Sequence, residues 1–118
     1  NALVKNSTGS YNVAEGLNAL RANTSGNINT AVGLSALLNN TTGGANIAVG
    51  GSAGSALTTG SNNIEIGNAG VAGDSGKMRL GTKGKQTSTF IAGISGVTVA
   101  GGVGVIIDSN GHLGTVVS

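Results

Sequence analysis

The chain has 118 residues and a formal net charge of +2, and only 8% of its residues are charged. Cys and Pro are absent, which excludes disulfides and thiolate metal sites and also a collagen helix. Disorder requires low hydrophobicity and high net charge, whereas 38% of this chain is hydrophobic. One Phe and one Tyr are its only aromatic residues, so we expect an ordered core of small side chains that other copies of the chain complete.

A 17-residue repeat organises residues 1–73. Two glycine series and one asparagine series recur at this spacing in a single register: Gly16, Gly33, Gly50 and Gly67; Gly9, Gly26, Gly43 and Gly60; Asn12, Asn29, Asn46 and Asn63. A fixed period of this kind is typical of solenoid architectures.

Apolar residues within each repeat alternate with the period of a strand, and no helical period is present. Two short strands and two turns would fill one repeat, so we predict an all-β fold, a parallel β-solenoid of four coils. Val and Ile share one strand face, and Ala14, Ala31 and Ala48 share the other. We expect both faces to be buried, with the Ala face free to meet neighbouring chains. The pattern therefore predicts a homotrimer.

The repeated Gly and Asn residues have structural roles in this interpretation. Gly16 and its equivalents would supply positive φ angles in tight turns. Asn12 and its equivalents would form a stacked ladder that hydrogen-bonds nearby backbone. The alternative is that the Asn side chains form a row of ligand-binding amides.

Three segments, 29–33, 46–50 and 63–67, read Asn-Thr-Ala-Val-Gly, Asn-Ile-Ala-Val-Gly and Asn-Ile-Glu-Ile-Gly. They resemble the Asn-Ser-Val-Ala-Ile-Gly-type motif in the heads of trimeric autotransporter adhesins (the YadA-like head). The resemblance covers residues 6–73, although the repeat is longer than is common in that family. It implies a left-handed β-roll that is trimeric about the fibre axis and attaches to host matrix or cells.

Residues 74–118 form a second predicted region, in which the period stops. Segments 77–80 and 86–94 suit strands, and segments 103–107 and 113–117 would form a hairpin around the turn sequence Asp108-Ser109-Asn110-Gly111. We therefore expect a short, β-rich, trimeric segment after the solenoid.

Segments 89–94 and 108–115 resemble the stretch that precedes the intramolecular chaperone of phage tail-fibre and endosialidase-type proteins. In that family the chaperone drives trimerisation and then cuts itself off at a Ser. The resemblance implies that this junction lies near Ser118.

We expect no catalytic, cofactor-binding or metal site. The segment Gly73-Asp74-Ser75-Gly76 is similar to a serine-protease nucleophile loop, but the chain's one His, His112, lies in the predicted hairpin. The four acidic residues are scattered, whereas calcium sites need clustered oxygens. The Asn-x-Ser/Thr sequons at Asn6, Asn23 and Asn40 recur with the turn, so we interpret them as turn chemistry.

Four of the six basic residues lie close together: Lys77, Arg79, Lys83 and Lys85. Threefold symmetry would gather them into a belt that contacts anionic glycan or lipopolysaccharide, or that merely keeps a charge-poor fibre soluble. Nucleic acid is not expected as a partner because no stacking aromatics lie nearby. Membrane insertion is not expected either, because the longest nearly apolar run, 97–107, is too short.

The sequence as a whole predicts a non-catalytic structural and adhesive module of a trimeric fibre. It would be extracellular, on a bacterial cell surface or a phage tail, and its partner would be a host-surface glycan or matrix protein. An ice- or polysaccharide-binding β-solenoid is the alternative, because repeated Thr surfaces serve that role.

Overall fold

The computed structural model describes residues 1–116. The described residues contain seven strands of three residues each and no helix, which confirms the all-β class. The chain divides into two compact units, Asn1–Thr82 and Lys83–Ser118.

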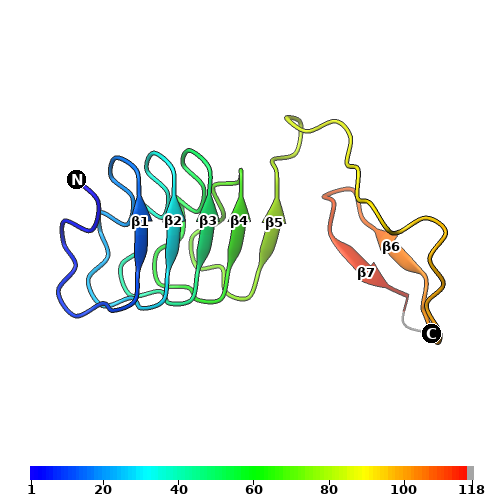
Figure 1. Ribbon diagram of the computed structural model, residues 1–118, viewed down its shortest axis with the longest axis horizontal. Helices are drawn as coiled ribbons and strands as arrows, with labels where there is room; N and C mark the ends of the chain where they lie inside the picture. The colour runs from blue at the N-terminus through cyan, green and yellow to red at the C-terminus, as the bar shows by residue number, and fades with distance from the viewer. Residues whose placement is uncertain (117–118) are drawn as a thin grey trace. The chain divides into compact units, whose positions relative to one another are not determined.

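The first unit is a parallel β-solenoid of about four turns (Figure 1). Each turn adds one strand beside the last, in the order β1 (Val13–Glu15), β2 (Thr30–Val32), β3 (Ile47–Val49), β4 (Ile64–Ile66) and β5 (Met78–Leu80). From β1 to β4 the paired residues are equivalent positions of the 17-residue repeat, such as Ala31 with Ala48. The predicted repeat is therefore the structural coil.

Each coil contains one short strand rather than the two that we expected. The opposite wall still bonds from coil to coil, since the Leu20 N–H donates to the Ala36 carbonyl oxygen and the Leu37 N–H to that of Ala53, both at 2.9 Å. However, Leu20 and Leu37 have φ angles of 50° and 51°. This left-handed conformation interrupts an extended strand, so the wall turns inward and buries its leucines.

The two strand faces point the other way from the prediction, since the Ala face lies inside the coil and the Val and Ile face lies outside it. Ala31 and Ala48 are fully buried and pack with Leu20 and Leu37 inside the coil. Ile47, on the other face of β3, is 42% exposed. The expectation that the Ala face meets neighbouring chains is therefore wrong, because the leucines of the opposite wall already cover it. The larger Val and Ile side chains point outward.

The two glycine series are required for different reasons. Gly16, Gly33, Gly50 and Gly67 all have positive φ angles, as predicted. Gly9 and its equivalents do not have positive φ angles. A Cβ on Gly9 would lie 2.5 Å from the carbonyl oxygen of Gly26 in the next coil. This second series is therefore glycine because neighbouring coils approach too closely for a side chain.

The last coil is shorter than the others. Ile64 pairs with Met78 and Ile66 with Leu80, a step of 14 residues. The repeat thus contracts rather than stops, and the first unit extends to Thr82, beyond the boundary expected after Gly73. The strand predicted at 77–80 is present as β5, but its apolar residues point outward and Arg79 is partly buried.

The second unit contains one antiparallel hairpin, β6 (Val105–Ile107) and β7 (Leu113–Thr115), which confirms the predicted pair. Asp108 stabilises the turn, since its Oδ1 accepts the N–H groups of Asn110 and His112 at 2.8 and 3.0 Å. The prediction of a strand at 86–94 is wrong for the described chain, because none of these residues belongs to a strand; Gln86 forms an isolated bridge with Lys83. The end of the expected strand 113–117 and the junction at Ser118 lie outside the described residues.

Ile28 provides a test of the coil geometry. It is 62% exposed and has a φ angle of 59°, a conformation that costs an L-residue about 1–2 kcal/mol. Asn62 occupies the equivalent position two coils later with a φ angle of 61°, and Asn tolerates this conformation. We expect Ile28→Asn to raise the thermal midpoint, corresponding to about 1 kcal/mol of stability.

The matched control is Leu34→Asn, since Leu34 is 56% exposed, lies outside the strands and has no positive φ angle. We expect this variant to show no gain in thermal midpoint. An equal loss in both variants would contradict the assignment of backbone strain to Ile28.

Candidate functional site

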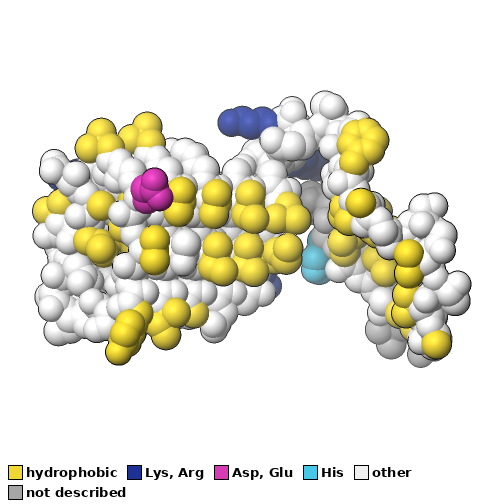
Figure 2. All heavy atoms as spheres, in the orientation of Figure 1, with side chains coloured by type: hydrophobic (Ala, Val, Ile, Leu, Met, Phe, Trp, Pro, Cys, Tyr) yellow, Lys and Arg dark blue, Asp and Glu magenta, His cyan; other side chains and the backbone are white. Residues whose placement is uncertain are grey.

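The outer face of the five-stranded sheet carries two columns of mostly apolar side chains. Equivalent residues stack in register along each column: Val13, Thr30, Ile47, Ile64 and Met78 in the first; Glu15, Val32, Val49, Ile66 and Leu80 in the second. Figure 2 shows them as two parallel rows that run across the solenoid. We call these ten residues the apolar sheet face.

The apolar sheet face is flat and almost uncharged. Neighbouring strands in a sheet are about 4.8 Å apart, so side chains in one column touch their neighbours above and below. Glu15 is its one charged residue and lies in β1, at the end of the sheet. Most of its large side chains are exposed: Met78 is 64% and Leu80 60% exposed. Contiguous exposed apolar surface of this kind marks interaction sites.

The Asn ladder is turned inward and is bonded from coil to coil. Asn29, Asn46 and Asn63 are fully buried. The Oδ1 of each Asn accepts the backbone N–H of the equivalent residue in the next coil, as between Asn29 and Asn46 at 3.0 Å. The Asn46 Nδ2 donates to the Gly60 carbonyl oxygen at 2.9 Å. These amides hold the coils together, and the buried ones cannot reach an external ligand.

A second amide ladder runs through Asn6, Asn23 and Asn40. Asn23 Nδ2 donates to Asn6 Oδ1 at 2.8 Å, and Asn40 Nδ2 donates to Asn23 Oδ1 at 3.1 Å. Leu57 occupies the next equivalent position and is buried in the core. The 17-residue recurrence of these Asn residues is visible in the sequence, but the burial of Asn23 and Asn40 does not follow from turn chemistry alone.

The last coil contains a buried ion pair where the other coils have Ala. Glu65 stands at the position of Ala48 and is fully buried, and its Oε1 lies 3.0 Å from Nη1 of Arg79. Arg79 also contacts Asp74 Oδ2 at 2.5 Å. Burial raises the pKa of the Glu65 carboxyl above its usual range, and the hydrogen bond from Arg79 opposes this. The other Glu65 oxygen, Oε2, is buried and makes no hydrogen bond.

The four basic residues predicted to form a belt have different environments. Arg79 is bound to two carboxylates, so its charge is compensated and it does not belong to a free cationic surface. Lys77 is exposed in the first unit, and Lys83 and Lys85 are exposed in the second. The three lysines stay predicted contacts for an anionic surface.

The segment that is similar to a protease nucleophile loop has other contacts in the structure. The Oγ of Ser75 accepts the backbone N–H of Ser61 at 3.1 Å, and Asp74 pairs with Arg79. His112 belongs to the other unit. Among residues 1–116, no group of three or more His, Cys, Asp or Glu side chains is placed to hold a metal ion. No helix long and apolar enough to span a membrane was found in the described part of the chain.

Comparison of the chain with protein-family models, with curated proteins and with solved structures gave no match.

The Glu65–Arg79 pair generates a prediction about stability. Removing one partner of a buried pair costs about 3–5 kcal/mol, because it leaves an uncompensated charge. Arg79 is partly exposed, so we expect Arg79→Ala to lose about 3 kcal/mol in urea unfolding at pH 7. The double variant Glu65→Ala, Arg79→Ala places at residue 65 the Ala that the other coils have at this position. Its free energy of unfolding should be closer to that of the wild type.

The loss in Arg79→Ala should depend on pH. A carboxyl whose pKa is raised by folding contributes stability below its ordinary pKa, and this contribution is lost as pH rises through the raised value. Burial raises the pKa of Glu65, so Arg79→Ala should recover stability relative to wild type as pH falls toward 4.5, the ordinary value. If Arg79→Ala lost the same amount of stability at pH 7 as at pH 4.5, the assignment of the cost to the Glu65 charge would be contradicted.

Proposed function

We propose that this chain is a non-catalytic structural and adhesive segment of a homotrimeric fibre on a bacterial surface or a phage tail. The apolar sheet face carries the proposal. It extends over all five strands of the solenoid, so a second and a third copy in parallel could cover it along its whole length. Burial of apolar surface contributes about 25 cal/mol per Å², which makes its continued exposure to water unfavourable.

The second unit supports the same proposal. All its described residues are exposed, including Phe90 at 94% and Val99 and Val103 at 71%. An isolated two-stranded hairpin is at best marginally stable in water. The aliphatic side chains of β6 and β7 therefore need a surface to pack against, and equivalent segments of two other copies would supply one.

The resemblance to trimeric adhesin heads and to the segment before a tail-fibre chaperone supports an extracellular location for the proposed trimer. The left-handed winding of the coils belongs to the same proposal. A stiff trimeric solenoid would present or space a surface that binds a host glycan or matrix protein.

The hydroxyl groups weigh against the ice-binding alternative. Ser7, Thr24 and Thr41 each donate a hydrogen bond from the side-chain oxygen to a carbonyl oxygen of the next coil, at 2.9, 3.1 and 3.2 Å. These hydroxyls are therefore used within the solenoid. Thr30 is the one Thr on the apolar sheet face. An ice-recrystallisation assay separates the two proposals, and we expect no inhibition.

The oligomeric state tests the proposal directly. We expect sedimentation equilibrium to give about three times the chain mass of 11.2 kDa. Val49→Lys should dissociate this assembly, because it would bury an unpaired charge in the proposed interface at a cost of several kcal/mol.

The matched control is Thr59→Lys, which adds the same charge at an exposed turn position. This variant should stay trimeric. A monomeric wild-type protein at micromolar concentration would refute the trimer, and a Val49→Lys protein that stays trimeric would refute the interface.

A further inference from the structure

A shallow hollow on the first unit lies away from the apolar sheet face. It has a volume of about 240 Å³ and is lined by Lys5, Arg21, Ala22, Leu38 and Asn39. Pockets for drug-sized ligands occupy roughly 300–1,000 Å³, so this hollow suits a smaller group. Its residues lie on the turn segments that connect the strands, and one protomer supplies all of them.

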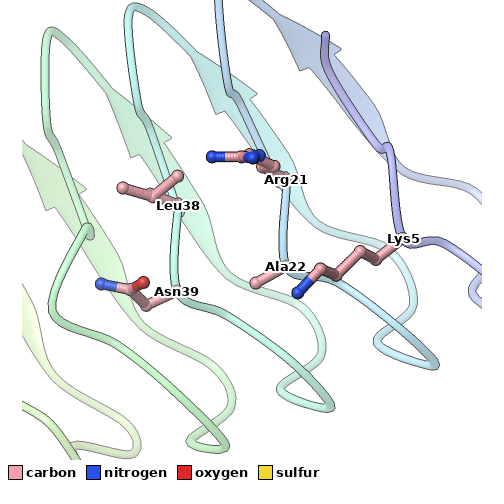
Figure 3. Close-up of a pocket in the computed structure, with 5 residues that line it drawn as sticks. All are labelled: Lys5, Arg21, Ala22, Leu38 and Asn39. Atoms are coloured by element: carbon pink, nitrogen blue, oxygen red, sulfur yellow. The ribbon is translucent and has the colours of Figure 1, made fainter.

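Three successive coils position the lining residues. The Lys5 N–H donates to the Arg21 carbonyl oxygen at 3.3 Å, and the Ala22 N–H donates to that of Leu38 at 3.1 Å. Figure 3 shows the Lys5 and Arg21 side chains extending from adjacent coils toward the coil that carries Leu38 and Asn39. The backbone bonds thus hold in register the adjacent coils that carry these two cationic side chains.

The charge of the hollow is uncompensated. No carboxylate among the described residues forms an ion pair with Lys5 or Arg21. Two like charges on adjacent coils repel each other, and an anion between them would remove that repulsion. Arg also binds carboxylates through two parallel hydrogen bonds.

The rest of the lining adds a second recognition element. Asn39 Nδ2 donates to the Ser55 carbonyl oxygen at 2.8 Å, and this fixes the amide. Its Oδ1 accepts no hydrogen bond from the described residues in the structure, so it can accept one from a hydroxyl group. Leu38 and Ala22 provide an apolar floor next to it.

We propose that this hollow binds one acidic sugar residue of a carboxylated polysaccharide. Its carboxylate would lie between Lys5 and Arg21, a hydroxyl would donate to Asn39 Oδ1, and the C–H face of the ring would cover Leu38. Nucleic acid fits less well, because no aromatic side chain lines the hollow to stack a base. The proposal deepens the adhesive role, but it does not depend on the trimer, since the hollow is complete in one protomer.

The probe is trigalacturonate, titrated into the isotope-labelled chain and followed by NMR, with neutral maltotriose as the uncharged control. We expect shifts of the backbone amide signals of Lys5, Ala22 and Asn39 with trigalacturonate and none with maltotriose. Lys5→Gln, Arg21→Gln should weaken binding at least about tenfold, because hydrogen bonds to charged groups are lost. Asn39→Asp should also weaken binding, through repulsion of the carboxylate.

The matched control is Lys83→Gln, Lys85→Gln, which removes the same charge from the second unit. It should change the affinity for trigalacturonate less than about twofold, because neither lysine lines the hollow. Equal losses in the two double variants would overturn the proposal in favour of unspecific attraction. Loss in the control alone would assign binding to the predicted lysine belt.

Two further outcomes would overturn the proposal. One is a wild-type protein that shows no shifts at millimolar trigalacturonate. The other is a single-stranded oligonucleotide that binds more tightly than trigalacturonate and also depends on Lys5 and Arg21. Sedimentation of the same samples keeps a failure of this proposal distinct from a failure of the trimer.

Discussion

The narrow interior of the coil is the constraint on which the rest of the structure depends. One wall of each coil is a three-residue strand, and the opposite wall carries Leu20 and Leu37 in two of the coils. The central strand residue that packs against these leucines must be small. Ala31 and Ala48 meet this requirement. The larger side chains of each strand then have no space inside and point outward. The apolar sheet face follows from how little the coil can hold, and its exposure is the physical basis for the proposed trimer.

The same constraint explains the polar interior and the end of the stack. Buried amides must be hydrogen-bonded, and equivalent Asn residues in neighbouring coils satisfy one another, as Asn29 and Asn46 do. Such a ladder works while the coils repeat. In the last coil, the contraction to a 14-residue step coincides with the ion pair of Glu65 and Arg79. The Arg79 side chain is 29% exposed, so this charged pair lies at the margin of the core.

The sequence predicts the coil but not which way its faces turn. Spacing alone identifies the 17-residue register, the parallel pairing and the turn glycines, since identical residues must stack in a solenoid. The strand period of two assigns Ala48 and Val49 to opposite faces of the strand, but it does not determine which face lies inside the coil. That choice depends on the opposite wall, where Leu37 adopts a left-handed conformation that no propensity favours. The inward Arg79 and the hollow at Lys5 and Arg21 were not predicted either, because both form between residues of different coils.

The burial of the apolar sheet face in the proposed trimer is tested most directly by measuring how well this face is protected from a thiol reagent. The chain has no Cys, so single thiols at Val49 and Thr59 can be compared without background. We predict that the Val49→Cys thiol reacts with maleimide only after denaturation, whereas the Thr59→Cys thiol reacts at once in the native protein. Equal and rapid labelling of both thiols in the native protein would contradict it, because the apolar sheet face would then be open to water.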